Sequence, residues 1–319
     1  MARAARPPDD RGPADGAPVP PGRGGSAPSF EAFAEAYLAQ SRRDHSPATA
    51  RTRRDLVRGK LVPFFRGRAL GEIAPADVEA LLAAHAGTSP ATRNRLLSAL
   101  SVIFKRARAL GLVRRNPAAR VPRAREEVTP LPLVSLAEQA ALLAALPEER
   151  RTLFLALLDT GARLGEVLGV RWGDLDLENP APALVVRRTK NRRPRVVRLS
   201  RRLANALGRA RAARAPAPDR AALVFGAAVA HGGWLRGSWR RSFKRAAAAA
   251  GHPRLRVHDL RHLAAINLVR AGVDLPTVQA HLGHRHLVST FRYAAYADET
   301  ASERAARTLD RIHGEAPGP

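Results

Sequence analysis

The chain has 319 residues, which is enough for roughly two domains that each bury a core of their own. It carries 54 lysines and arginines against 28 aspartates and glutamates, a formal net charge of +26. A codon bias toward arginine leaves the deficit of acidic residues unexplained, so we expect a polyanionic partner, by default nucleic acid. The absence of cysteine excludes disulfides and thiolate metal sites. No apolar run approaches the ~18–20 residues that span a bilayer, and no secretory signal is visible, so we expect a cytoplasmic protein without a membrane contact.

The N-terminal segment is rich in Pro, Gly, Ala and Arg and shows no periodic apolar pattern. Such a segment cannot bury enough apolar surface to fold, so residues 1–28 are predicted to be a disordered basic tail. Two readings of this tail stay open: a simple extension of the chain, or an arm that grips the polyanion.

Residues 29–117 predict a small domain of four helices. Ser29, Ser46 and Ser89 each stand where a serine can cap a helix, directly before apolar residues that recur at helical spacing. The third helix is expected from Pro75 to His85. The polar faces of these helices carry basic residues, namely Arg51, Arg53, Arg54, Arg93, Arg95, Lys105 and Arg106.

Prolines recur in the next stretch, and because proline removes a hydrogen-bond donor and breaks helices, residues 118–135 are predicted to be an extended linker. A second domain, residues 136–319, is expected to combine helices with a small antiparallel sheet, so the chain is predicted to be mainly α with a mixed α+β C-terminal domain. Its expected elements are helices at Leu136–Leu146 and Thr152–Leu158, strands at Ala183–Arg188 and Arg195–Leu199 joined by a polar turn, and helices from Ser238 to the end.

The first of four segments that predict chemistry runs from Thr160 to Leu168 and reads T-G-A-R-L-G-E-V-L. Gly161 is expected to end one helix and Arg163 to stand at the start of the next. A guanidinium there offers a forked donor to a phosphate, beside free helix N–H groups. Glu166 could hold this arginine in place; the alternative is an ordinary surface Arg–Glu pair.

The second is Lys190, in the predicted turn between the two strands. Only four lysines occur in the chain, at positions 60, 105, 190 and 244, while arginine is used almost everywhere else that a positive charge is needed. Lysine can release a proton at an accessible pKa whereas arginine cannot, and a general acid needs that property. The alternative is a surface lysine without a role.

The third segment, His258-Asp259-Leu260-Arg261-His262, opens a predicted helix. His258 and Arg261 are three residues apart and project to one face, where an imidazole and a guanidinium suit a phosphate or the group that attacks it. Two alternatives stay open. The leucines could pack a core while the polar residues are solvated. His258 and His262 could instead bind a metal, although the central Glu of H-E-x-x-H is missing and Arg261 would repel a cation.

The fourth segment is the L-G-H sequence that ends at His284, followed nine residues later by Tyr293. Gly283 is expected to end a short helix, which places His284 in the loop after it. Ser289 and Thr290 are predicted to cap a further helix that carries Tyr293. A tyrosine is more often a packed amphipathic residue, but only three occur in the chain and two lie in this stretch.

Together these segments resemble the tyrosine recombinases, the family of phage integrases and Xer-type resolvases. The family's pattern is an arginine box (T-G-x-R-x-x-E), a hairpin lysine, H-x-x-R, L-G-H and then R-Y. Each motif is common by chance, but five in this order are specific. The N-terminal domain is similar to the family's helical core-binding domain, a SAM-like four-helix unit. The matching residues are Arg163, Lys190, His258, Arg261, His284 and Tyr293, with Glu166 in support.

The nucleophile segment departs from the family's usual Tyr-Ala-His, because this chain reads Tyr-Ala-Ala-Tyr from Tyr293 to Tyr296. Tyr296 is therefore a second candidate nucleophile, but the interval from His284 matches Tyr293. The alignment of Lys190 rests on a hairpin whose length varies within the family.

The resemblance implies a site-specific recombinase that cleaves and rejoins duplex DNA through a 3′-phosphotyrosyl intermediate, without ATP, metal or another cofactor. Tyr293 would attack the phosphate. Arg163, Arg261 and His284 would bind the developing charge. His258 would position or deprotonate the phenol, and Lys190 would protonate the leaving 5′-oxygen.

The same resemblance implies double-stranded DNA as partner, nucleoid association, and a homotetramer on two DNA sites, with accessory DNA-bending or directionality proteins. The last predicted helix, Ala301–Ile312, could dock on a neighbouring subunit or pack on its own domain. The basic residues expected to contact DNA are Arg51, Arg54, Arg93, Arg95 and Lys105.

Three other functions stay open at this point. A type IB topoisomerase would use the same residues to relax supercoils without exchanging partners. A non-catalytic descendant would bind DNA without cutting it. A general basic nucleic-acid protein would carry the motifs by accident, which their order argues against.

Overall fold

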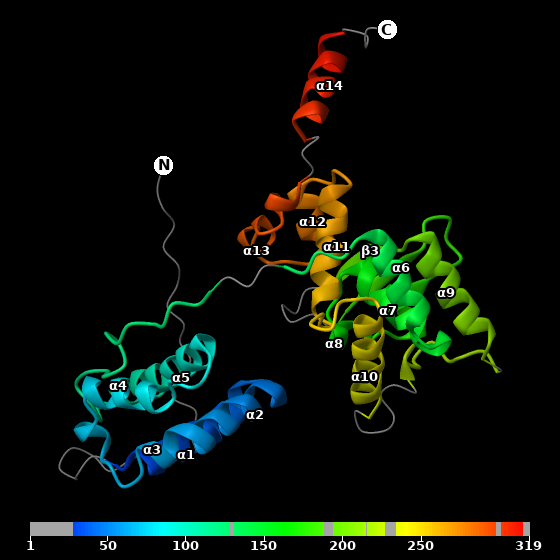
Figure 1. Ribbon diagram of the computed structural model, residues 1–319. Coiled ribbons are helices and arrows are strands. Elements are labelled where there is room, and N and C mark those ends of the chain that lie inside the picture. The colour runs from blue at the N-terminus through cyan, green and yellow to red at the C-terminus, as the bar shows by residue number, and fades with distance from the viewer. Residues whose placement is uncertain are drawn as a thin grey trace, which may run out of the picture. The chain divides into compact units, whose positions relative to one another are not determined.

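The chain divides into two compact units, Met1–Val128 and Thr129–Pro319. In Figure 1 the helices of the first unit are coloured blue to cyan and those of the second run from green to red. Each unit buries apolar side chains of its own. The computed structural model describes residues 28–127, 131–187, 194–214, 216–226, 234–297 and 301–314.

The first unit consists of helices, several of which begin at serine caps. Ser29, Ser46 and Ser89 each accept a hydrogen bond from a backbone N–H of the first turn, which confirms the predicted starts. The elements are α1 (Phe30–Asp44), α2 (Pro47–Leu56), a π-helical turn (Val57–Leu61), α3 (Val62–Phe64), a 3-10 turn (Leu70–Glu72), α4 (Pro75–Ala84) and α5 (Pro90–Ala109).

Aromatic side chains from distant parts of the first unit meet in its core. The ring of Phe30 in α1 lies 5.0 Å from that of Phe65 and 6.3 Å from that of Phe104 in α5, measured between centroids. All three side chains are fully buried. Because burying one such side chain contributes roughly 1.5–3 kcal/mol, these contacts hold the first and last helices of the unit together.

The second unit combines helices with a three-stranded antiparallel sheet of order β1-β2-β3, in which Val186 pairs with Arg195. This arrangement confirms the predicted fold class. No helix within the described ranges is both long and apolar enough to cross a membrane. The elements are α6 (Leu136–Ala145), α7 (Glu148–Thr160), α8 (Leu164–Val167), a 3-10 turn (Trp172–Asp174), β1 (Leu175–Asp176), β2 (Ala183–Val186), β3 (Arg195–Arg198), α9 (Arg201–Ala212), α10 (Trp234–Ala249), α11 (Asp259–Arg270), α12 (Leu275–Leu282), α13 (Val288–Phe291), a 3-10 turn (Ala294–Tyr296) and α14 (Ala301–His313).

Two helix starts in this unit were predicted too late. α7 begins at Glu148 rather than Thr152, because charged residues without an apolar pattern form its first turn. α10 begins at Trp234 rather than Ser238. α9 was not predicted, and neither was the short strand β1.

The prediction that Ser289 and Thr290 cap a helix carrying Tyr293 is wrong. α13 ends at Phe291, and Tyr293 lies in the turn that follows. The backbone there forms short-range bonds: the Tyr293 N–H donates to the Thr290 oxygen and the Tyr296 N–H donates to the Tyr293 oxygen, both at 2.9 Å. These tight turns carry Tyr293 into the interior, where it is only 1% exposed.

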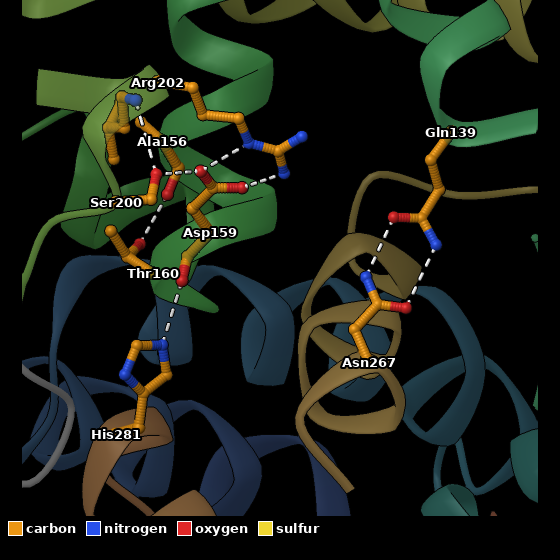
Figure 2. A network of polar contacts seen from close by, with 9 residues as sticks. Gln139, Ala156, Asp159, Thr160, Ser200, Arg202, Asn267 and His281 are labelled. Atoms are coloured by element: carbon orange, nitrogen blue, oxygen red, sulfur yellow. Dashed lines mark hydrogen bonds and ion pairs between the residues drawn. The ribbon is translucent and has the colours of Figure 1, made fainter. Parts of the chain in front are cut away.

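Polar contacts hold α11 and α12 against the first helices of the unit, as Figure 2 shows. His281 of α12 donates from Nε2 to the backbone oxygen of Asp159 in α7 at 2.9 Å. The side-chain amides of Gln139 in α6 and Asn267 in α11 exchange hydrogen bonds of 2.9 and 3.1 Å. The Asp159 carboxylate in turn accepts a hydrogen bond from Arg202 of α9. The helices that carry the third and fourth sequence segments are thereby fixed to α6 and α7.

The end of α7 meets α11 and α12 at a glycine. Gly161 has a φ of 57°, in the left-handed region. A Cβ added to it would lie 2.4 Å from Cδ2 of Leu282 and 3.3 Å from Cβ of Ala264. Both the backbone conformation and the lack of space require glycine, and this close approach brings the segment after Gly161 next to α11 and α12.

Gly161→Ala should destabilise the second unit by more than the strain of alanine in the left-handed region, which is about 1–2 kcal/mol. Gly251→Ala is the matched control, because Gly251 has a φ of +84° but nothing within 4 Å of an added Cβ. Urea unfolding of both variants should show the larger loss for Gly161→Ala. Equal losses of unfolding free energy in the two variants would mean that the Leu282 side chain can move away from the added methyl group without destabilising the fold.

Candidate active site

The segment around Arg163 forms as predicted, with Gly161 ending α7 and Arg163 at the N-cap of α8. The Glu166 carboxylate accepts hydrogen bonds from the backbone N–H of Arg163 at 3.1 Å and from its Nη1 at 2.8 Å. The Glu166 side chain is 4% exposed and that of Arg163 is 31% exposed. The pair is therefore not an ordinary surface pair: a buried carboxylate holds a guanidinium that stays partly accessible.

A second guanidinium, which none of the sequence motifs includes, shares the same carboxylate. Arg195, the first residue of β3, donates from Nη2 to Oε2 of Glu166 at 3.2 Å, and its side chain is 11% exposed. It also packs on Gly283, where an added Cβ would lie 2.9 Å from both Cδ and Nη1 of Arg195. Arg195 thus connects the Arg163–Glu166 pair to the L-G-H turn.

Arg261 lies in the interior, 4% exposed. Its Nη1 donates to the backbone oxygen of Gly161 at 2.5 Å, while its Nη2 is buried and has no hydrogen-bond partner in the part of the chain that the structure describes. Burial, together with the positive charges of Arg163 and Arg195, lowers the pKa of Arg261 to about 10. The side chain remains charged at neutral pH, and an anion beside Nη2 would offset the cost of burying that charge.

The two histidines of the third segment have different surroundings. His258 stands at the N-cap position of α11 and is exposed, whereas His262, one turn later, is 8% exposed. Their rings meet edge to face with centroids 5.3 Å apart. Leu260 and Leu263 do pack a core, but Arg261 and His262 are buried with them, so the polar side chains are not simply solvated.

His284 follows the end of α12, where Gly283 adopts a φ of 70°, as predicted. Nδ1 of His284 lies 2.9 Å from Oγ1 of Thr290, a fully buried residue. Burial and the positive charge of Arg261 lower the pKa of His284 to about 4, so the ring is neutral at neutral pH. Because Nδ1 is occupied by a hydroxyl, Nε2 is the nitrogen left to face a ligand.

The phenol of Tyr293 lies among these histidines. Its oxygen is 2.7 Å from Nδ1 of His262, and its ring is parallel to that of His284 with centroids 6.5 Å apart. Burial raises the pKa of the phenol, partly offset by neighbouring guanidinium groups. The second candidate, Tyr296, is half-buried at the edge of the same apolar cluster. The tyrosine in contact with a site histidine is therefore Tyr293.

The imidazole in contact with the phenol oxygen of Tyr293 belongs to His262. The role expected of His258, to position or deprotonate the phenol, stays a prediction. From the sequence, His262 was a candidate only as a metal ligand and Thr290 only as a helix cap, and no role in the site was expected of Arg195. The sequence did hold a signal for each of them. His262 follows Arg261 directly, Thr290 lies three residues before Tyr293, and Arg195 belongs to the predicted hairpin.

Thr290→Val should slow any reaction that needs an oriented His284, because valine matches the shape of threonine but lacks the hydroxyl. The loss of one buried hydrogen bond, roughly 1–1.5 kcal/mol, corresponds to about a 10-fold lower rate. Thr290→Ser, which keeps the hydroxyl, is the control. Single-turnover DNA cleavage measures both; equal rates for the two variants would show that the hydroxyl of Thr290 does not set the rate.

Lys190, the predicted general acid, lies outside the described residues, as do residues 1–27 of the predicted tail. The basic residues predicted to contact DNA lie on α2 and α5 of the first unit. Of these, Arg93 is half-buried, and its Nε has no hydrogen-bond partner within the described ranges. The exposed ones are Arg51, Arg54, Arg95 and Lys105.

Comparison with known proteins identifies the class that this fold and this site define. Residues 133–300 match the model of the phage integrase family, and residues 30–124 match that of the phage integrase central domain. The first match alone covers more than half of the chain. The chain therefore belongs to the phage integrase family, the tyrosine-type site-specific recombinases.

Individual relatives agree with this assignment. The tyrosine recombinase XerC of Rhodospirillum centenum is 35% identical over 239 residues, covering 70% of this chain and 68% of that protein. A tyrosine recombinase of Thermosipho africanus is 30% identical over 290 residues, covering 85% and 95%. Among solved structures, a lambda integrase tetramer bound to a Holliday junction matches with a TM-score of 0.66 at 19% identity, covering 82% of this chain and 78% of that one. The structural match supports the fold, and the sequence matches support the enzyme class.

Proposed function

We propose that this chain cleaves and rejoins duplex DNA by attack of the Tyr293 phenol on a phosphodiester, which leaves a 3′-phosphotyrosyl link. The observation that carries the proposal is the buried Nη2 of Arg261, a charged donor without a hydrogen-bond partner among the described residues. Arg163 and Arg195 bring further positive charge, and both pair with the single carboxylate of Glu166. This excess of positive charge suits a phosphate, which would lie beside the phenol.

Several side chains of the site stabilise the negative charge that develops on the phosphate during the reaction. As the phenol attacks, negative charge grows on the non-bridging oxygens of the phosphate. Arg163 and Arg261 bind these oxygens, and His284, held by Thr290, donates from Nε2–H. His258, exposed at the start of α11, supplies a further donor to the same phosphate.

The leaving 5′-oxygen needs a proton, which Lys190 supplies in this proposal. The covalent link conserves the energy of the broken bond, so a second DNA 5′-hydroxyl can attack and reseal the strand. Neither ATP nor a metal ion takes part in these steps.

Double-stranded DNA is the partner in this proposal. The first unit contributes the exposed basic residues of α2 and α5, with Arg93 as a half-buried member of the group. Because each phosphate contact releases counterions, DNA affinity should fall steeply as salt rises. We expect accessory DNA-bending or directionality proteins as further partners.

Assembly into four protomers on two DNA sites is the second part of the proposal. Leu309 and Ile312 of α14 are 54% and 68% exposed, which leaves an apolar pair available for a neighbouring protomer. Deleting residues 301–319 should remove tetramers on DNA, measured by light scattering of the protein–DNA complex. Tetramers that persist after the deletion would contradict this part of the proposal.

A supercoiled plasmid carrying two copies of the DNA that flanks the chain's own gene tests the function as a whole. We expect recombined circles from this plasmid, and none with Arg261→Ala. A type IB topoisomerase would instead relax plasmids whether or not they carry the copies. A non-catalytic DNA-binding protein would shift the plasmid on a gel without breaking it. Either of these results, without recombined product, would contradict the proposal.

A further inference from the structure

We propose that His262 is a catalytic residue whose Nδ1 takes the proton of the Tyr293 phenol as the phenol oxygen attacks the phosphate. The inference deepens the proposed function and rests on it, because it requires Tyr293 to be the nucleophile. It assigns the proton of the nucleophile to a different histidine from the one in the H-x-x-R motif.

The two side chains are in direct contact. Nδ1 of His262 lies 2.7 Å from the phenol oxygen, and the ring centroids are 5.9 Å apart at an interplanar angle of 50°. His262 is 8% exposed and Tyr293 is 1% exposed, so bulk solvent is poorly placed to receive the proton. A general base must lie within hydrogen-bond reach of the proton that it removes, and His262 meets this condition.

His262 has a free lone pair at neutral pH. Burial, together with the positive charge of Arg292 and the neighbouring His258, lowers the pKa of His262 to about 4, so its ring is neutral. Nδ1 can then accept from the phenol O–H while Nε2 carries the ring proton. Burial raises the pKa of the phenol, so the phenol keeps its proton until it reacts. The negative charge of a bound DNA phosphate favours the imidazolium that forms.

The other site histidines are placed for other tasks. Nδ1 of His284 is engaged by Thr290, and its ring lies parallel to the phenol ring rather than toward the phenol oxygen. His258 lies one helical turn before His262 and is exposed. Among the described residues, His262 is therefore the base nearest to the reacting proton.

The proton balance of the step is complete. In cleavage, the O–H bond of Tyr293 breaks and its proton moves to Nδ1 of His262. The phenol oxygen bonds to phosphorus, the bond from phosphorus to the 5′-oxygen breaks, and that oxygen takes a proton from an acid, for which Lys190 is proposed. In resealing, the incoming 5′-hydroxyl gives its proton to the acid that was deprotonated in cleavage, for which Lys190 is proposed. Its oxygen bonds to phosphorus, the phosphorus–tyrosine bond breaks, and His262 returns its proton to Tyr293.

His262→Asn is the informative variant. The asparagine oxygen can take the place of Nδ1 and accept the same hydrogen bond, but it is not basic. In single-turnover cleavage of a nicked duplex from the DNA that flanks the chain's own gene, this variant should form the adduct about 100-fold more slowly, within the range typical of a lost general base. DNA affinity should not change. His252→Asn is the matched control, because His252 pairs with Glu138, and it should react at the rate of the unaltered chain.

A duplex with sulfur in place of the scissile 5′-oxygen separates the base from the acid. A thiolate leaves without needing a proton, so this substrate should restore cleavage by Lys190→Ala but not by His262→Asn. Unaltered cleavage of the oxygen substrate by His262→Asn would overturn the proposal, because the contact would then only position the phenol. Recovery of His262→Asn on the sulfur substrate would also overturn it, because His262 would then act on the leaving group.

A replacement variant and the adduct of the unaltered chain keep the test decisive. If His262→Asn shows no unfolding transition, His262→Gln replaces it with the same expected results. If the unaltered chain forms no adduct at Tyr293, the proposed function fails, and the role of His262 fails with it. If that adduct forms and His262→Asn matches its rate, only the role of His262 fails.

Discussion

Replacing Tyr293 with phenylalanine should abolish the covalent protein–DNA adduct. The substitution removes the attacking oxygen but keeps the ring that packs with α11 and α12. Loss of a catalytic nucleophile typically costs about 10⁴-fold or more in rate, so no adduct should appear on a denaturing gel over the time in which the unaltered chain reacts to completion. DNA binding should persist, because the guanidinium groups remain.

Tyr296→Phe is the matched control for this substitution. It makes the same chemical change three residues away, at a half-buried tyrosine of the same cluster. We expect it to form the adduct at the unaltered rate. Because Tyr293→Phe also leaves His262 without its partner, which costs about 1–3 kcal/mol, unfolding curves should accompany the assay. An adduct that survives in Tyr293→Phe and is lost in Tyr296→Phe would contradict the assignment.

Glu166→Gln should destabilise the second unit by about 3 kcal/mol or more, because breaking a buried ion pair typically costs about 3–5 kcal/mol. Glu166 is 4% exposed, and its partner Arg195 is 11% exposed. An uncharged amide would leave the charges of Arg163, Arg195 and Arg261 without their carboxylate. Cleavage should slow as well, because Arg163 loses the contact that orients it. Urea unfolding measures the first effect and adduct formation the second.

Glu178→Gln is the control for the loss of an acidic side chain. Glu178 pairs with Arg211 at 3.4 Å, and its side chain is 87% exposed. Exposed pairs contribute little because water screens them, so the urea midpoint should not move. A similar loss in both variants would mean that the burial of Glu166 does not set its contribution.

The same carboxylate predicts how stability depends on pH. Burial opposes ionisation of Glu166, but the hydrogen bonds from Arg163 and the charge of Arg195 outweigh it and hold the pKa of Glu166 below its usual value. Its contribution is therefore fully present above the unfolded-state pKa of about 4.3 and is lost as the pH falls through the lower folded-state pKa. Below that unfolded value the unaltered chain should lose stability more steeply than Glu166→Gln. If the unfolding free energies of the unaltered chain and of Glu166→Gln change in parallel with pH, the lowered pKa of Glu166 would be contradicted.

Local signals in the sequence predicted much of the fold. Serine caps fix the starts of α1, α2 and α5, and glycines in the left-handed region end α7 and α12, as expected at Gly161 and Gly283. These features depend on a few neighbouring residues, so they can be read without tertiary structure.

Helix α9 was not predicted, and the backbone around Tyr293 was predicted wrongly. α9 buries Leu203, Ala206 and Leu207, but most of its other residues are arginine and alanine, so few large apolar residues mark the buried face in the sequence. The prediction of a helix around Tyr293 was wrong for a different reason. Thr290 looked like a cap, yet its hydroxyl is taken by His284, and tight turns replace the expected helix.

In the candidate site too, the sequence predicted the residues that lie in local motifs but not the contacts that depend on tertiary packing. The motifs predicted Arg163, Glu166, Arg261, His284 and Tyr293, and the structure brings these residues into one region of the second unit. The missed contacts join residues far apart in sequence, since Arg195 reaches Glu166 and His262 reaches Tyr293 only through the packing of β3 and α11. No spacing rule within a single helix or turn predicts such contacts.

Mass spectrometry of the DNA-linked peptide tests the central claim most directly. The purified chain is incubated with a nicked duplex from the DNA that flanks its own gene, denatured, and digested with nuclease and protease. The account predicts a nucleotide attached through its 3′-phosphate to Tyr293. A nucleotide on Tyr296, or no linked peptide from DNA that the chain demonstrably recombines, would contradict it.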